Sequence, residues 1–92
     1  MSPTIEHEPG RFFTRVEGLE AEVVYERRGQ VLDVTHTWTP PPLRGRDLAA
    51  RLTEAVCRYA RDHDLHIIPT CSYTRQFLAT HPEWRTLTNE ST

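Results

Sequence analysis

The sequence contains little of what a secreted or membrane-bound protein needs. Its two cysteines, Cys57 and Cys71, are too few to hold a small secreted domain together, so we interpret both as free thiols. No apolar run approaches the length that spans a bilayer, and the polar residues 1–10 match neither a signal peptide nor an anchor. A cytoplasmic location is therefore the expectation.

The sequence also lacks a strong charge excess and any metal-binding spacing. Eleven basic and 13 acidic residues give a formal net charge of −2, so nothing draws the whole molecule to nucleic acid or to an anionic membrane. Arg27-Arg28 and the Arg44/Arg46 pair are too sparse for a nucleic-acid-binding patch. The histidines and cysteines show neither C-x-x-C nor H-x-x-x-H spacing. We predict no metal site and neither nucleic acid nor membrane as a partner.

A chain of 92 residues has room for one domain. With 37% hydrophobic and 26% charged residues its composition is that of an ordinary globular protein. We predict a single domain over residues 11–87, with loose tails at 1–10 and 88–92. So short a domain has a thin core, and a bound ligand or a dimer would help to stabilise it.

Alternating hydrophobicity predicts three antiparallel strands at Arg11–Val16, Glu20–Arg28 and Val31–Trp38. Turns at Glu17–Leu19 and Gly29-Gln30 connect them into a meander. In the third strand the alternation assigns four side chains to one face: Leu32, Val34, His36 and Trp38.

After the third strand, the spacing of apolar residues changes from the period of a strand to that of a helix. Three prolines, at positions 40–42, end the third strand, and residues 47–63 place their apolar side chains on one helical stripe. Leu65–Pro69 is a short apolar run, which we interpret as a fourth strand parallel to the third because a helical crossover separates them. Ser72–Thr80 predicts a second, shorter helix with Ser72 as its N-cap. The predicted fold is α+β, in the order β-β-β-α-β-α.

Three motifs occur in sequence along this fold. Thr35–Pro40 ends a strand, Arg44-x-x-Asp47-x-Ala49 leads into the long helix, and Pro69-x-Cys71-x-Tyr73 forms a turn after the fourth strand. Together they resemble the GNAT superfamily of acetyl-CoA-dependent N-acetyltransferases, and in particular its very small single-domain members. The resemblance covers about residues 12–87.

The resemblance implies that acetyl-CoA binds at the loop before the long helix. A helix N-terminus presents unpaired N–H groups to an anion, Arg44 and Arg46 supply positive charge for the pyrophosphate, and Gly45 lets the backbone approach the ligand. The residues implied in cofactor binding are Trp38, Thr39, Arg44, Gly45, Arg46, Asp47, Leu48 and Ala49.

Asp47 departs from the family pattern, which has glycine at this position. One interpretation is that its carboxylate caps the helix and complements the helix dipole. The other is that the carboxylate repels the pyrophosphate and weakens or abolishes cofactor binding.

Transfer of the acetyl group by direct attack of an amine needs an amide donor for the oxyanion and groups that accept and donate protons. Cys71 is a candidate nucleophile, or a residue that only lines the pocket. His36 is a candidate base, or a structural histidine on an apolar face. Tyr73 is a candidate proton donor to the departing thiolate, or a packing residue. We assign no role to Cys57.

The leading hypothesis is therefore an N-acetyltransferase acting on an amine that the sequence does not identify. A tight turn at Glu17–Leu19 replaces the two helices of larger family members, so the acceptor side is expected to be open. Such a site suits a protein side chain or terminus, or completion by a homodimer, and a small amine also fits. The alternative, favoured by Asp47, is a non-catalytic acyl-CoA-binding or protein-interaction module. A purely structural domain of the same topology is the third hypothesis.

Overall fold

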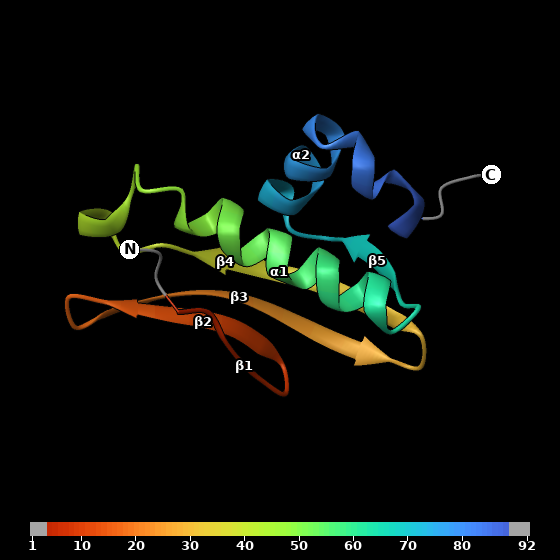
Figure 1. Ribbon diagram of the computed structural model, residues 1–92, viewed down its shortest axis with the longest axis horizontal. Coiled ribbons are helices and arrows are strands. Elements are labelled where there is room, and N and C mark those ends of the chain that lie inside the picture. Colours follow the sequence, from red (N-terminus) through yellow and green to blue (C-terminus); the bar gives the residue numbers. More distant parts are fainter. Residues whose placement is uncertain (1–3, 89–92) are drawn as a thin grey trace.

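The computed structural model describes residues 4–88 and shows one mixed sheet with its helices on one side (Figure 1). The strands lie in the order β1-β2-β3-β4-β5. Their bounds are β1 Glu6–Glu8, β2 Arg11–Val16, β3 Leu19–Arg28, β4 Val31–Trp38 and β5 His66–Pro69. The helices are α1 Leu48–Asp62 and α2 Ser72–Thr80, with short 3₁₀ turns η1 Pro41–Leu43 and η2 Pro82–Leu87.

The main part of the predicted topology is confirmed. Strands β2, β3 and β4 form an antiparallel meander, and β5 pairs with β4 in parallel after the α1 crossover. A parallel neighbour requires such a crossover, because a tight turn returns the chain in the opposite direction. The fold is α+β, with the predicted order of elements from β2 to α2.

The prediction of a loose tail over residues 1–10 is wrong for residues 6–10. Glu6–Glu8 forms β1, which pairs antiparallel with β2, and Gly10 turns the chain with a φ of 99°. The Tyr25 amide donates to the Gly10 carbonyl oxygen at 2.9 Å, which fastens the turn to β3. The side chains of β1 are polar and exposed, so the segment carries no hydrophobic alternation. Residues 1–3, and 89–92 of the other predicted tail, lie outside the described part of the chain.

A β-bulge interrupts β4. Tyr25 lies opposite Val34, whereas Val24 lies opposite His36, so Thr35 is an extra residue on β4. A bulge places two residues of one strand opposite one of its partner and shifts the alternation of side chains by one position. After Thr35, the side chains of β4 therefore lie on the opposite face of the sheet from the one that strict alternation predicts.

The bulge corrects the predicted face of the third strand. Leu32 and Val34 are buried as predicted, but His36 and Trp38 lie on the opposite face of the sheet, where both are exposed. Thr37 takes their place on the α1 face, opposite the fully buried Val23. The predicted apolar environment of His36 does not exist.

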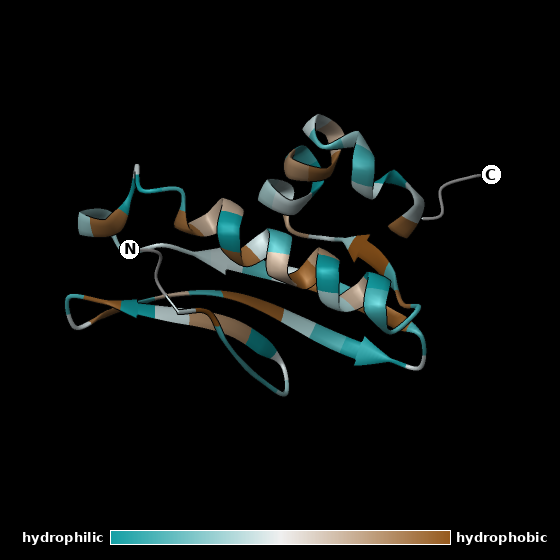
Figure 2. Ribbon diagram, viewed as in Figure 1, coloured by the Kyte–Doolittle hydropathy of each residue, from teal (hydrophilic) through white to brown (hydrophobic). Residues whose placement is uncertain are grey.

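Helix α1 covers the centre of the sheet with one apolar stripe. Leu52, Val56 and Ala60 have no solvent exposure, and they pack in one cluster with residues of the sheet and of α2 and η2. Figure 2 shows hydrophobic and hydrophilic residues alternating around this helix. Burial of one such leucine or valine side chain contributes about 1.5–3 kcal/mol. Within residues 4–88, no helix is both long enough and apolar enough to cross a membrane.

Candidate functional site

The loop between β4 and α1 contains two residues in the left-handed region of backbone conformation. Gly45 has a φ of 84° and Asp47 a φ of 62°. A Cβ atom on Gly45 would meet nothing within 4 Å, so the backbone conformation rather than crowding favours glycine there. Leu43 is fully buried and anchors the loop to the core.

The first turn of α1 presents unpaired backbone amides. Its first backbone hydrogen bond runs from the Arg51 amide to the Asp47 carbonyl oxygen at 3.0 Å. The amides of Leu48, Ala49 and Ala50 therefore have no acceptor within the helix. Asp47 is the N-cap residue, but its carboxylate makes no capping hydrogen bond, so the prediction that it caps the helix through its side chain is wrong.

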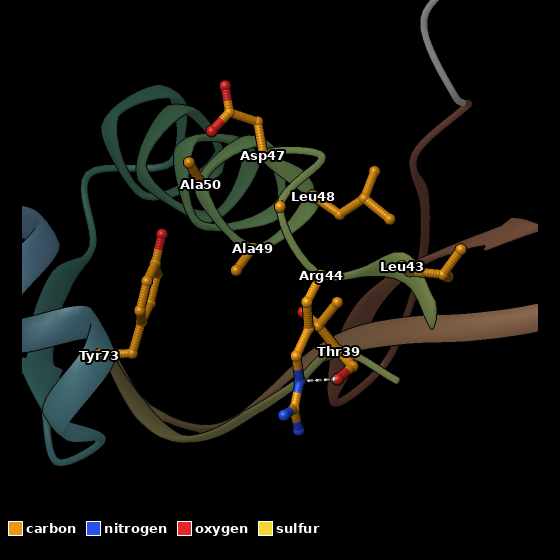
Figure 3. A pocket seen from close by; sticks show the side chains of 9 residues that line it. Thr39, Leu43, Arg44, Asp47, Leu48, Ala49, Ala50 and Tyr73 are labelled. Atoms are coloured by element: carbon orange, nitrogen blue, oxygen red, sulfur yellow. Dashed lines mark hydrogen bonds between the residues drawn. The ribbon is translucent and has the colours of Figure 1, made fainter. Parts of the chain in front are cut away.

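A cavity of about 230 Å³ lies beside these amides. Its lining residues come from the loop, the first turn of α1 and the start of α2: Thr39, Leu43, Arg44, Gly45, Asp47, Leu48, Ala49, Ala50 and Tyr73. In Figure 3 the Tyr73 ring and the Arg44 side chain face each other across the opening, with the small Ala49 side chain between them. The Asp47 carboxylate points away from this opening (Figure 3).

Arg44 and Arg46, predicted to act together, lie apart. Arg44 lines the cavity, where its Nε donates to the Thr39 carbonyl oxygen at 3.1 Å and its guanidinium lies 5.5 Å from the centre of the Trp38 ring. Arg46 is not among the lining residues and pairs with Glu17 at 3.3 Å. An exposed ion pair of this kind is weak, so it restrains Arg46 only slightly.

Strand β4 extends beyond its parallel partner. The last β4–β5 pair joins Val34 and Pro69, and the Cys71 amide then donates to the Val34 carbonyl oxygen at 2.8 Å. From Thr35 to Trp38 the β5 side of β4 is therefore an open strand edge. The two strands therefore diverge beyond the Val34–Pro69 pair.

Cys71 lies at this divergence and at the beginning of α2. It occupies the N-cap position that was predicted for Ser72. Its Sγ lies 3.4 Å from Oγ1 of Thr37, the residue that the bulge turns toward the helices. Cys57, in contrast, is buried in α1.

The two thiols differ in acidity. Partial burial raises the pKa of Cys71, but the Thr37 hydroxyl and the amides of Thr74 and Tyr73 favour the thiolate, and the net effect is a lowered pKa. Burial raises the pKa of Cys57 to about 12, with smaller contributions from Glu54 and Glu83. Cys71 is therefore the more reactive thiol of the two.

Tyr73 keeps its proton at neutral pH. Partial burial raises the pKa of its phenol, and the negative charge of Asp47 adds to this effect. The hydroxyl group is thus a proton donor on the wall of the cavity.

The structure brings most of the predicted site residues together. Seven of them line the cavity: Thr39, Arg44, Gly45, Asp47, Leu48, Ala49 and Tyr73. Cys71, at the N-cap of α2 two residues before Tyr73, does not line it, and neither do His36, Trp38 and Arg46. Leu43, Ala50 and Thr37 were not predicted, and the bulge that places Thr37 has no signal in the sequence. Nowhere in the described part of the chain do three or more His, Cys, Asp or Glu side chains gather as a metal site requires.

Comparison with known proteins identifies the family. The sequence model of the GCN5-related N-acetyl-transferase family matches residues 11–87. The chain therefore belongs to the GCN5-related N-acetyltransferase (GNAT) family.

Individual relatives agree with this assignment. Protein NATD1 of Bos taurus is 32% identical over 83 residues, covering 85% of this chain and 74% of the relative. Protein NATD1 of Danio rerio is also 32% identical, with coverage of 85% and 76%. The solution NMR structure of a GCN5-like protein from Staphylococcus aureus, described as a candidate N-acetyltransferase, has a TM-score of 0.70 at 24% identity, covering 95% of this chain and 89% of that one. This last similarity shows that the two proteins share a fold.

Proposed function

We propose that this chain is an N-acetyltransferase that takes its acetyl group from acetyl-CoA and transfers it to an amine. The observation that carries the proposal is the cavity at the N-terminus of α1, where the unpaired amides of Leu48, Ala49 and Ala50 lie beside Arg44. Such an arrangement favours a phosphate or pyrophosphate group.

The small residues and the charge at the helix end support this proposal. Gly45 and Ala49 keep side-chain bulk away from the helix end, so a pyrophosphate can approach the amides. Asp47 is the acidic lining residue, and its carboxylate points away from the opening between Arg44 and Tyr73 (Figure 3). This orientation supports binding of an anion although Asp47 occupies the position of the family glycine.

The open edge of β4 and the start of α2 would hold the reacting end. When bound, acetyl-CoA supplies an activated acyl carbonyl. Backbone N–H groups on the unpaired edge of β4 are available to stabilise a developing oxyanion. Tyr73 holds a proton for a departing thiolate, and Cys71 presents a thiol of lowered pKa beside Thr37. His36 faces the other side of the sheet and is not part of this proposed machinery.

The first test is thermal unfolding with acetyl-CoA and with free coenzyme A. A ligand that binds only the folded state raises Tm in a saturable way. We expect such a rise for both ligands, and a much smaller one in Arg44→Gln. Arg58→Gln, on the exposed face of α1, is the matched control and should respond like the wild type. No shift at millimolar ligand would overturn the proposal.

The second test is thiol release from acetyl-CoA across a panel of amines. All 11 basic residues of the chain are arginines, so no lysine side chain can act as an internal acceptor. Release that depends on an added amine supports the transferase. Saturable binding without release for any amine supports the alternative, a non-catalytic acyl-CoA-binding module.

A further inference from the structure

A second cavity lies at the opposite end of α1 from the first. Its volume is about 430 Å³, and it is lined by His7, Glu8, Pro9, Gly10, Tyr25, Arg27 and Tyr59. These residues belong to the β1–β2 turn, to β3 and to the last part of α1. Tyr59 lies eleven residues beyond Leu48, or ~16 Å along the helix axis. The second cavity is therefore separate from the proposed coenzyme A site.

Aromatic rings form the walls of this cavity. His7 stacks on Phe12 with ring centres 4.0 Å apart and meets the Tyr59 ring edge-on at 4.7 Å. The ring centres of Tyr25 and Tyr59 are 6.5 Å apart. The Tyr25 hydroxyl forms a hydrogen bond with Nε2 of His7 at 2.5 Å. This bond gives the Tyr25 hydroxyl and Nε2 of His7 a partner, and burial together with the charge of His63 lowers the pKa of His7. The aromatic part of the wall is thus flat and largely apolar, and the charged lining residues are Glu8 and Arg27.

One positive charge at the edge of the cavity is not neutralised. Arg27 donates to the Tyr59 hydroxyl and to the Gly29 carbonyl oxygen, both at 3.2 Å, and within residues 4–88 no carboxylate is paired with it. The acidic lining residue, Glu8, is bound by Arg11 at 2.6 Å. Hydrogen bonds to two neutral oxygens leave the guanidinium able to bind an anion in a bidentate manner.

We propose that this second cavity binds a small planar aromatic ligand that carries one carboxylate. The ring would lie against the aromatic walls in an offset or edge-on arrangement, as aromatic groups prefer. The carboxylate would accept hydrogen bonds from Arg27 and from the Tyr59 hydroxyl. Because the ligand would contact both the β1–β2 turn and α1, it would hold β1 against the rest of the domain.

The test is NMR titration of the ¹⁵N-labelled full chain with three probes that share a ring and differ in charge: benzoate, benzyl alcohol and benzylamine. We expect benzoate to shift the amides of Gly10, Tyr25 and Tyr59, with a Kd on the order of 1 mM for so small a ligand. The alcohol should bind at least about threefold more weakly and the amine more weakly still, since neither supplies an anion to Arg27.

Variants at Arg27 and Tyr59, with Arg28→Gln as the control, test which groups bind the carboxylate. Arg27→Gln should weaken benzoate binding by about tenfold and remove the preference over benzyl alcohol, because a charge-assisted hydrogen bond is lost. Arg28→Gln, at the next position on the other face of β3, should bind benzoate like the wild type. Tyr59→Phe keeps the ring and should weaken benzoate by a smaller factor.

Equal binding of the three probes, or unchanged benzoate affinity in Arg27→Gln, would overturn the proposal. The absence of shifts at the cavity amides with 10 mM benzoate, on the order of ten times the expected Kd, would overturn it as well. The spectrum of each variant without ligand reports whether it is folded. Because the experiment contains no acetyl-CoA, no acetyl group can be transferred to any probe, and its result is independent of the proposed transferase activity.

Discussion

Asp47 adopts, at the first turn of α1, a backbone conformation that glycine adopts most easily. A φ of 62° brings the Cβ of an ordinary residue close to the backbone, and aspartate tolerates this better than most residues do. Its carboxylate gives no compensating capping hydrogen bond. The residue thus contributes strain rather than a cap at this position.

A comparison of Asp47→Gly with Asp47→Ala measures this strain. We expect the glycine variant to exceed the alanine variant in free energy of unfolding by about 1 kcal/mol, because alanine retains the Cβ without tolerance for positive φ. Urea denaturation monitored by circular dichroism gives the value. An alanine variant as stable as the glycine variant would contradict the conformation described for Asp47.

Cys71 and Cys57 provide an internal comparison of thiol reactivity. We expect iodoacetamide to modify Cys71 rapidly in the native protein, with a pH midpoint below that of an unperturbed thiol, because the thiolate is the reactive form. Cys57 should react only on unfolding, since it is buried and its pKa is raised to about 12. Mass spectrometry of the labelled peptides distinguishes the two.

Of the two side chains that favour the Cys71 thiolate, Thr37 and Thr74, the Thr37 hydroxyl contributes more. Thr37→Val should move the pH midpoint of Cys71 alkylation upward, because it removes the hydroxyl 3.4 Å from Sγ. Thr35→Val, at the bulge, is the control and should leave the midpoint in place. Equal midpoints in all three proteins would show that Thr37 does not set this pKa.

At the scale of elements, the junction between β4 and β5 depends on Asp33. The Thr70 hydroxyl, just after β5, donates to one oxygen of its carboxylate at 2.5 Å, and Arg28 of β3 donates to the other at 3.0 Å. The hydrogen bond from Thr70 lowers the pKa of Asp33 most, burial opposes this, and Arg28 adds to the lowering. This one carboxylate connects three segments of the sheet close to Cys71.

Asp33→Asn should destabilise the protein at neutral pH and have progressively less effect in acid. The folded pKa of Asp33 lies below its unfolded value, so its contribution is present at neutral pH and is lost as pH falls through the folded pKa. We expect a loss of about 1 kcal/mol in free energy of unfolding at pH 7, in line with a charged hydrogen bond near the surface. Urea titrations of both proteins at pH 7 and in strong acid measure it. Asp62→Asn, at the exposed end of α1, is the control and should change the free energy of unfolding at pH 7 much less.

At the scale of the whole molecule, stability depends on one thin layer between α1 and the sheet. Leu52 is fully buried at the centre of that layer. A domain of this size has about 5–15 kcal/mol of stability, and removal of a buried leucine side chain costs about 2–5 kcal/mol. A single substitution in the core therefore removes a large part of the free energy of unfolding.

Leu52→Ala should lower Tm by at least about 10 °C, and acetyl-CoA should restore part of the loss. The drop follows from the ~4–8 °C per kcal/mol typical of small domains, and the recovery from the ~2.7 kcal/mol that a ligand supplies at 100 times its Kd. Differential scanning calorimetry with and without ligand measures both. Leu19→Ala, at a partly buried position, is the control and should lose much less. A loss in Leu52→Ala no larger than in Leu19→Ala would contradict the described core.

The sequence by itself determined the elements whose signal is local. The stripe of α1 and the alternation of β2 and β3 follow from neighbouring residues, because the side-chain period is a short-range property. The roles of Arg44, Gly45 and Ala49 were implied by the family resemblance. The crossover rule then added the parallel β5. These signals were sufficient for the fold class, and the family resemblance implied seven of the residues that line the first cavity.

Only the tertiary structure decided where the other side chains point. The bulge at Thr35 depends on how β4 pairs with β3, and it reversed the faces of His36, Thr37 and Trp38. Strand β1 forms because its backbone pairs with β2, although its side chains are exposed. Arg46 turns to Glu17, which lies far away in sequence. Each of these outcomes depends on pairing between distant segments, and the periodicity of a single segment carries no information about such pairing.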